Sequence, residues 1–256
     1  MPLTFTTAIL RQPCCEIVHG ITSAKLGKPD FARAVSQHQK YAGVLEMCGL
    51  QVRMLESDPR FPDSLFIEDI ALCTPACAII TRPGAPTRTG ETEGMREILS
   101  EYYPDLEEIA SPGTLEAGDV MMVGMHFYIG LSARTNREGA GQLMSILKDH
   151  GLSGSMVPLK EVLHLKTAVS YLEGNTLLVC GEFIGHPGFE RFNKIEVTVE
   201  EAYAANSLWI NGTVLVPEGF PETRSKIERE GYPVITLNMS EFQKLDGGLS
   251  CLSLRF

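Results

Sequence analysis

The sequence lacks several features that each mark a class of protein. It has 22 Lys and Arg but 32 Asp and Glu, which gives a formal net charge of −10. This charge argues against nucleic acid or an anionic membrane surface as the main partner, because both bind basic patches. No run of about 18 apolar residues is present, so we expect no membrane-spanning helix. The opening MPLTFTTAILRQP lacks the basic and apolar regions of a secretory signal peptide. An acidic protein is compatible with a small cationic substrate.

Paired cysteines are also missing. The chain has seven cysteines and no CxxC spacing, so structural zinc is not expected. Without a secretory signal, we predict free thiols in a reducing cytoplasm. The seven are Cys14, Cys15, Cys48, Cys73, Cys77, Cys180 and Cys251.

No nucleotide-binding loop or long linker interrupts the chain. Neither a GxGxxG motif at a strand-helix turn nor a Walker-type loop is present, which disfavours the doubly wound nucleotide-binding sheet, the simplest competing architecture. The absence of a Gly/Ser/Pro-rich boundary predicts one domain over residues 1–256. At 44% hydrophobic and 21% charged residues, the composition is that of an ordinary globular protein.

A weak internal recurrence is present instead. Segments 68–99, 118–147 and 205–237 each read as a polar residue, a short apolar strand, a turn, a second apolar strand, an Arg near a Thr, and an amphipathic helix. Segment 164–184 supplies another strand-turn-strand pair around Gly174-Asn175. Counting both ends, the unit strand-strand-helix-strand occurs about five times. Such a period favours a closed ring of small mixed sheets with helices outside.

Both ends of the chain carry structural signals. In segment 28–55 we predict a helix followed by a strand, with Gly49 ending the helix. The face expected to be buried comprises Phe31, Val35, His38, Ala42 and Leu45. At the other end, LSCLSLRF alternates apolar residues like a strand, and it follows Gly247-Gly248, where the chain can approach another segment closely.

Two arginines precede predicted helices. Thr135 and Glu138 have capping-box spacing, so a helix is expected to begin there, with Arg134 just before its positive end. Arg88 has a similar place in its own repeat, before Glu91. Either side chain could pair with nearby glutamates or turn to solvent. Alternatively, two guanidinium groups at neighbouring repeats could converge on one carboxylate.

Acidic residues gather beside apolar strands. Charges in such places are costly unless paired or hydrogen-bonded, and a carboxylate cluster with few neighbouring lysines is what a guanidinium pocket requires. For Asp119 we favour a structural capping role. The set is Asp63, Glu68, Asp69, Glu116, Asp119 and Asp246.

A cysteine, a histidine and an orienting carboxylate form the usual arrangement for thiolate catalysis. Cys251 is the candidate nucleophile, although a packing role is equally compatible with its surroundings. His164 lies in an apolar stretch and His19 in a glycine-containing loop. The residues alone leave open which histidine meets Cys251.

The motifs together resemble the dimethylarginine dimethylaminohydrolases of bacterial type. FPDSLFIED, RPGAPTRTGE, TLEAGDV, GLSARTNREGA, VLHLKT and DGGLSCLSLRF carry the resemblance, which runs nearly end to end. It implies the pentein fold, an α/β propeller of five strand-strand-helix-strand units around a pseudo-fivefold axis. It also implies hydrolysis of methylated arginine to citrulline and di- or methylamine through a covalent thiouronium on cysteine, without metal or cofactor. A homodimer is a further expectation of the family.

The resemblance also implies a role for each site residue. Cys251 matches the nucleophile, His164 the general acid and base, and Glu116 the carboxylate at the reacting guanidinium. Asp69 and Asp246 match the acids that hold the guanidinium nitrogens. The residues matching contacts to the amino-acid end and neighbouring groups are Ile21 in the mobile lid, Asp63, Glu68, Arg88, Arg134 and Leu245.

Three other activities share this fold. An arginine deiminase would act on unmethylated arginine, but those enzymes usually carry an inserted helical region that is not found here. An amidinotransferase would pass the amidino group to an amine and normally has a longer chain. A non-catalytic binding module of the same fold is disfavoured because Cys251, His164 and Glu116 occur together.

Overall fold

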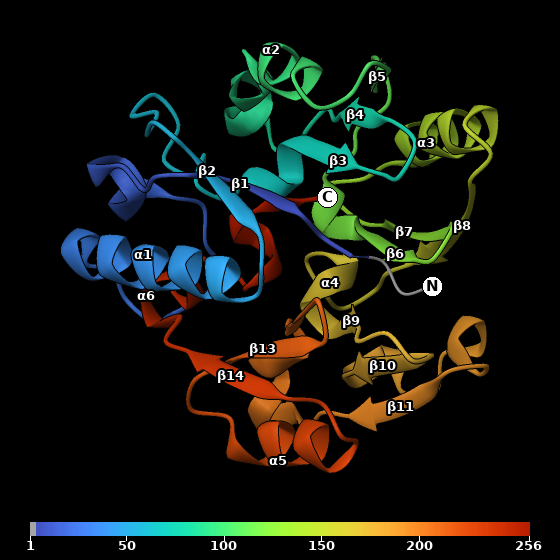
Figure 1. Cartoon of the computed structure of the whole chain (residues 1–256). Helices are drawn as coiled ribbons and strands as arrows, with labels where there is room; N and C mark the ends of the chain where they lie inside the picture. Colours follow the sequence, from blue (N-terminus) through green and yellow to red (C-terminus); the bar gives the residue numbers. More distant parts are fainter. Residues whose placement is uncertain (1–3) are drawn as a thin grey trace.

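One strand order is repeated around the molecule. The computed structural model describes residues 4–256, in which five sheets of three strands surround a common centre (Figure 1). In every sheet the central strand pairs antiparallel with one neighbour and parallel with the other. This confirms the predicted ring of five strand-strand-helix-strand units.

The sheets follow one another along the chain. Their strands, each sheet in spatial order, are β15 (Leu254–Arg255), β1 (Thr7–Arg11) and β2 (Gln51–Leu55); β3 (Ala71–Cys73), β4 (Ala78–Ile80) and β5 (Leu106–Glu108); β6 (Val120–Val123), β7 (His126–Leu131) and β8 (Ser153–Pro158); β9 (Val169–Tyr171), β10 (Thr176–Val179) and β11 (Asn193–Glu196); β12 (Leu208–Ile210), β13 (Thr213–Pro217) and β14 (Val234–Leu237).

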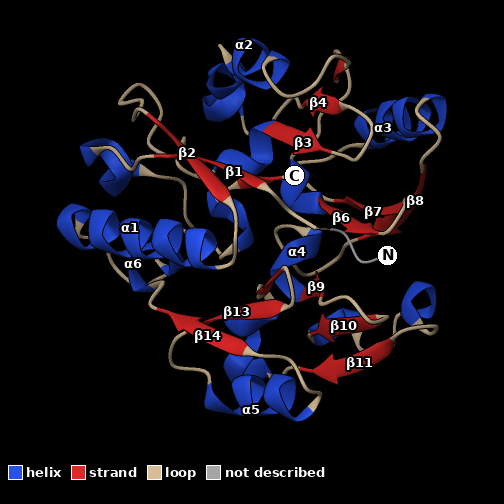
Figure 2. Cartoon of the chain, viewed as in Figure 1, coloured by secondary structure: helices blue, strands red, loops and turns tan. Residues whose placement is uncertain are grey.

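Most of the α-helices cover the outside of the ring, as Figure 2 shows, whereas α4 (Leu165–Ala168) lies near its centre. The parallel pairing within each unit requires a crossover connection, and helices fill most of these crossovers. The α-helices are α1 (Phe31–Met47), α2 (Met95–Ser100), α3 (Arg137–Asp149), α4 (Leu165–Ala168), α5 (Pro221–Arg229) and α6 (Ser240–Gln243). None of the helices in residues 4–256 combines the length and the apolar character needed to cross a membrane.

The C-terminal strand closes the ring. Residues of β15 pair with the N-terminal strand β1, Leu254 opposite Ile9 and Arg255 opposite Ala8. The strand is shorter than LSCLSLRF predicted, because Cys251 lies on a 3₁₀ helix, η8 (Ser250–Leu252). The backbone N–H groups of η8 have partners outside any sheet: Ser250 N donates to the side chain of Asn206, and Cys251 N donates to the carbonyl of Gly248.

Helix α1 forms where it was predicted, with its buried face displaced. The buried residues are Ala34, His38, Tyr41 and Leu45, so the prediction was right for His38 and Leu45. Phe31, expected in the core, is 38% exposed. Both sets alternate steps of 3 and 4 residues and share one stripe of the helix, but Ala34 and Tyr41 are buried in place of Val35 and Ala42.

The N-terminus of α3 differs from the capping-box prediction by one residue. Asn136 is the cap, and its side chain accepts a hydrogen bond from Gly139 N at 2.8 Å. Thr135 is buried and turns inward instead, where its hydroxyl accepts from Glu116 N at 3.1 Å. The residue predicted to cap the helix therefore supports a site residue.

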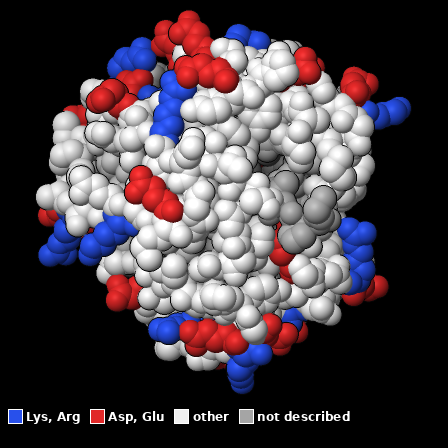
Figure 3. All heavy atoms as spheres, viewed as in Figure 1, with Lys and Arg blue, Asp and Glu red and all other residues white. Residues whose placement is uncertain are grey.

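Short helices fill the middle of the ring. The 3₁₀ helices η2 (Ile67–Ile70) and η4 (Ala117–Asp119), together with α4 and η8, contact one another there. On the face drawn in Figure 3, charged side chains of both signs lie mostly at the perimeter, and the centre is largely uncharged. The predicted catalytic residues therefore lie on or next to these short central helices and not on the strands of the sheets.

Candidate active site

A single cavity gathers most of the predicted site residues. It has a volume of about 40 Å³ and lies beside Cys251 and His164. Every predicted site residue except Glu68 lines it: Ile21, Asp63, Asp69, Arg88, Glu116, Arg134, His164, Leu245, Asp246 and Cys251. Phe66, Leu163 and Gly247 complete the lining.

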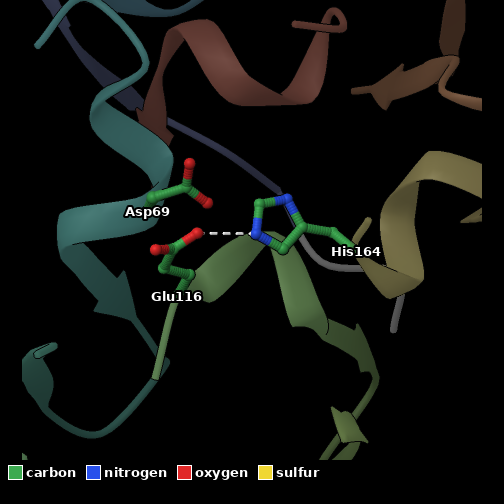
Figure 4. A group of neighbouring side chains, drawn as sticks. All are labelled: Asp69, Glu116 and His164. Atoms are coloured by element: carbon green, nitrogen blue, oxygen red, sulfur yellow. Dashed lines mark hydrogen bonds and ion pairs between the residues drawn. The ribbon is translucent and has the colours of Figure 1, made fainter. Parts of the chain in front are cut away.

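His164 is the histidine that lies beside the cysteine. It is buried at the start of α4, and its Nε2 lies 2.7 Å from Oε2 of Glu116, which precedes η4 (Figure 4). His19, the other candidate, is exposed and lies near Glu16 instead. The pairing left open by the sequence is therefore between Cys251 and His164, which line the same cavity.

Negative charge keeps the imidazole protonated. Burial opposes the charged form, but the carboxylates of Asp69, Glu116 and Asp119 raise the pKa of His164 to about 9. In turn, despite its burial, Glu116 has its pKa lowered by the hydrogen bond and charge of His164. At neutral pH the pair is an imidazolium and a carboxylate.

The thiol of Cys251, by contrast, is kept in its neutral form. Burial, followed by the charges of Glu68 and Asp69, raises the pKa of Cys251 to about 12. Gly248 N donates to Sγ at 3.3 Å and partly offsets this effect. Without a ligand, the site therefore holds a neutral thiol beside a cationic histidine.

Three glycines allow the segments to meet. A Cβ on Gly247 would overlap the ring of Phe66, and one on Gly248 would overlap the side chain of Asn206. On Gly118 it would lie 2.8 Å from both Asp69 Oδ1 and His164 Nδ1. The close approach predicted for the glycine pair is confirmed, and Gly118 is a further position of this kind.

The two arginines approach different acids. Arg88 is buried in the 3₁₀ helix η3 (Pro86–Thr92), where its Nη1 lies 2.6 Å from Asp69 Oδ2 and its Nη2 2.8 Å from Glu91 Oε2. Nη1 of Arg134 lies 3.4 Å from Glu116 Oε1. Each arginine has its own carboxylate partner, so pairing with a nearby glutamate was the correct alternative for Arg88.

A segment near the N-terminus covers the cavity. Ile21 N donates to the Asp63 carboxylate at 3.0 Å. Ser23 donates to Asp246 Oδ2 through its backbone N at 2.6 Å and its hydroxyl at 2.9 Å, and Thr22 donates to the carbonyl of Lys244. One oxygen of Asp246 is thus held by this covering segment, residues 20–28, which we call the lid.

Glu68 lies outside the cavity that gathers the other predicted site residues. Its carboxylate is buried and accepts from Lys166 Nζ at 2.6 Å, Ser250 Oγ at 2.7 Å and Arg255 Nη2 at 2.8 Å. It lines a different cavity, of about 140 Å³. The structure thus places Glu68 in contact with the residue that precedes Cys251, and its expected contact to substrate stays a prediction.

A second small cavity lies on another side of the same pair. It has a volume of about 40 Å³ and shares His164, Asp246 and Cys251 with the first. Apart from Gly248, its remaining lining was not predicted as part of the site, because these residues either lie within motifs whose charged members drew the prediction or, as Tyr203 and Asn206, lie outside every motif. The remaining lining comprises Gly118, Lys166, Thr167, Tyr203, Asn206, Gly248 and Ser250.

Asp69, Glu116 and His164 also offer donor atoms within 4.8 Å of one another, a spacing that a metal ion could accept. These atoms are engaged already, His164 with Glu116 and Asp69 with Arg88. A metal would have to displace an imidazolium and a guanidinium, whereas an organic cation can share these carboxylates, because an ionised carboxylate has about four acceptor sites. The donor set fits recognition of an organic cation better than metal binding.

Comparison with known proteins gives the family. The arginine deiminase family profile matches residues 58–201. The N(G),N(G)-dimethylarginine dimethylaminohydrolase of Pseudomonas aeruginosa is 56% identical over 98% of this chain and 100% of its own. The chain belongs to the dimethylarginine dimethylaminohydrolase family. The Streptomyces coelicolor member is 33% identical over 97% of this chain and 96% of its own.

Solved structures agree with this assignment. A cysteine-to-serine mutant of the Pseudomonas aeruginosa dimethylarginine dimethylaminohydrolase, complexed with citrulline, superimposes with a TM-score of 0.98 at 55% identity, covering 99% of this chain and 100% of that one. The N-terminal domain of the arginine dihydrolase ArgZ superimposes with a TM-score of 0.88 at 20% identity, covering 97% of each chain. The second likeness shows the shared fold alone, and that fold is the predicted pentein propeller.

Proposed function

We propose that the protein hydrolyses Nω,Nω-dimethyl-L-arginine, or the monomethyl form, to L-citrulline and dimethylamine or methylamine. The observation that carries this proposal is the cavity in which Cys251, the cationic His164 and the carboxylates of Asp69 and Glu116 meet. A desolvated acidic pocket beside a thiol suits a planar guanidinium cation. The family assignment supports the same substrate class.

The binding roles follow the lining of the cavity. Asp69 and Glu116 would hold the guanidinium nitrogens, with Asp246 as a third acid once its lid contact is released. Arg88 and Arg134 supply positive charge, and Asp63 negative charge, for the carboxylate and amine of the amino-acid end. Ile21 and Leu245 border the same cavity.

The lid must move for substrate to enter. A volume of about 40 Å³ is little more than the space of one water molecule, which takes about 30 Å³ in the liquid. Thr22 and Ser23 bond Lys244 and Asp246, and Asp246 lines the cavity. Binding therefore exchanges these lid contacts for contacts to the substrate.

The first half of the reaction forms a carbon–sulfur bond. The cationic substrate promotes loss of the Cys251 proton to solvent, and the thiolate attacks the guanidinium carbon. His164 then donates its proton to the departing nitrogen, which leaves as a neutral amine instead of an amide anion. The product of this half is a cationic thiouronium on Cys251.

The second half adds water. Neutral His164 takes a proton from water, and the resulting hydroxide attacks the thiouronium carbon. Collapse of this adduct breaks the carbon–sulfur bond, expels the Cys251 thiolate and leaves citrulline, while the remaining proton passes to the released amine. The thiolate then takes back one proton from solvent, which restores the neutral thiol. Overall, one cation and one water give a neutral ureido product and an ammonium ion.

The test is direct. Purified protein is incubated separately with asymmetric dimethylarginine, monomethylarginine and arginine, and citrulline is measured against a Cys251→Ser control. We expect citrulline from the methylated substrates and none from the variant. A higher kcat/KM for arginine would overturn the choice of substrate, and citrulline from the variant would overturn the role of Cys251.

Arginine deiminase activity is the second candidate. Its supporting observation is the match of residues 58–201 to the arginine deiminase family, since both reactions use the same attack on a guanidinium carbon. The three-substrate assay separates the two activities.

Three broader expectations belong with this proposal. All seven cysteines are free in the structure, which supports a reducing cytoplasm. Catalysis by one domain over residues 1–256 and assembly as a homodimer stay predictions, which limited proteolysis and light scattering would test.

A further inference from the structure

One asparagine is bonded to both segments that carry the reacting groups. Asn206 follows the 3₁₀ helix η7 (Val199–Ala205) and is buried. Its Nδ2 donates to the carbonyl of Lys166 at 2.9 Å and to Ser250 Oγ at 3.1 Å, and its Oδ1 accepts from Ser250 N at 3.0 Å. The side chain thus forms three hydrogen bonds, all to residues of these two segments.

These two segments come from distant parts of the sequence. Lys166 lies two residues after His164 on α4, and Ser250 lies immediately before Cys251 on η8. The chain between them includes two whole sheets, so no local constraint sets the separation of the imidazole and the sulfur. Asn206 connects their backbones through a single planar amide.

Contacts around Asn206 restrict the same loop further. The backbone at Gly248 packs so closely on the asparagine side chain that a Cβ there would overlap it. Tyr203, on the preceding helix, donates to the carbonyl of Gly247 at 2.7 Å. Gly248 N in turn donates to the Cys251 sulfur. Movement of the asparagine is therefore transmitted to the group that stabilises the thiolate.

We propose that Asn206 is a positioning residue that fixes the Cys251 sulfur relative to the His164 imidazole. This role rests on the function proposed above. Asn206 does not line the cavity that gathers Asp63, Arg88 and Arg134, so it acts on the reaction rather than on binding of the amino-acid end. Its loss should lower kcat and leave KM nearly unchanged.

The chain contains a matched control. Asn211, between β12 and β13, also makes one accepted and two donated hydrogen bonds: from Phe5 N at 2.9 Å, to Phe5 O at 2.8 Å and to Cys48 O at 3.0 Å. It lies outside both cavities at Cys251. The same substitution there removes equivalent bonds without touching a catalytic segment.

The experiment compares Asn206→Asp, Asn206→Ser and Asn211→Asp. The aspartate keeps the shape of asparagine but turns an oxygen towards the Lys166 carbonyl, and it adds negative charge. The serine breaks the bridge without adding charge. Because a displacement of about 1 Å can cost about a hundredfold in rate, we expect both Asn206 variants to lose about 10- to 100-fold in kcat, with KM within about twofold of the wild type. Asn211→Asp should keep both constants.

A second readout is independent of turnover. The pH dependence of Cys251 alkylation by iodoacetamide, followed by mass spectrometry of its peptide, should move to higher pH in both Asn206 variants and stay unchanged in Asn211→Asp. Equal kcat and an equal alkylation profile in Asn206→Ser and wild type would overturn the proposal, as would equal losses in the Asn211 control. If the wild type forms no citrulline, the proposed function fails, while the alkylation profile still tests the positioning of the sulfur.

Discussion

Ionisation of Cys251 should depend on the charge of the ligand. The free thiol has a pKa of about 12 because it is buried and faces Glu68 and Asp69, so almost none of it is thiolate at pH 7. A cation about 4 Å from the sulfur contributes about 4 kcal/mol at an effective dielectric constant of about 20. At about 1.4 kcal/mol per pKa unit, that lowers the pKa by about three units.

Two small ligands of the same shape separate charge from occupancy. Methylguanidinium is a cation without an amino-acid end, and methylurea is its neutral counterpart. The thiolate of Cys251 is followed by its ultraviolet absorbance during a pH titration, with the Cys251→Ser variant subtracted to remove the other six cysteines. We expect methylguanidinium to lower the midpoint by about three units and methylurea to leave it in place.

Identical midpoints with both ligands would refute this reasoning. They would mean that the charge of the ligand does not set the ionisation of the sulfur. A free-enzyme midpoint near the ordinary cysteine value of about 8.5 would also refute it, because burial and the two carboxylates could not then be the dominant influences on the thiol.

Three further predictions concern single substitutions. Gly118→Ala should lower the rate of citrulline formation at least about a hundredfold, because the added Cβ would lie 2.8 Å from His164 Nδ1. The control is Gly141→Ala, where the added Cβ meets nothing within 4 Å; it should keep activity and raise the free energy of unfolding by about 1 kcal/mol in chemical denaturation. Glu116→Gln removes a carboxylate that raises the pKa of His164, so the alkaline limb of the kcat–pH profile should shift to lower pH; an unshifted limb would contradict the assignment. Burial lowers the pKa of His38 from 6.5 to about 4, so on acidification the unfolded state takes up a proton before the folded state does. The free energy of unfolding should therefore fall by up to about 3 kcal/mol between pH 6.5 and 4. Urea titrations at both pH values measure this loss, and His38→Gln should abolish it.

Local patterns in the sequence were sufficient for the repeating unit. Alternating apolar residues, turn glycines and helix caps act over a few neighbouring residues, so the five strand-strand-helix-strand units could be predicted before any contact was known. The limits of such patterns appear at element ends. Thr135 was predicted to cap α3, yet Asn136 does so, because Thr135 accepts a hydrogen bond from Glu116 in the completed fold.

The motifs identified the reacting residues but not their partners. Arg88 and Glu91 are close in sequence, and their pairing was foreseeable as an alternative. The partners of Glu68 could not be predicted, because Lys166 and Arg255 come from other parts of the ring. No local pattern indicates which of the adjacent acids Glu68 and Asp69 will line the cavity at Cys251.

The sequence by itself therefore determined the five-unit architecture, the kinds of reacting group and the family to which they belong. Tertiary structure alone decided that the lid segment bonds Asp246 and that Asn206 joins the two catalytic segments. It also placed His164 rather than His19 at the cavity of Cys251, a choice that the family resemblance implied but the residues alone left open. The physical reason is the closure of the ring. The C-terminal strand β15 pairs with the N-terminal strand β1, and this closure brings together groups whose separation along the chain carries no information about their distance in space.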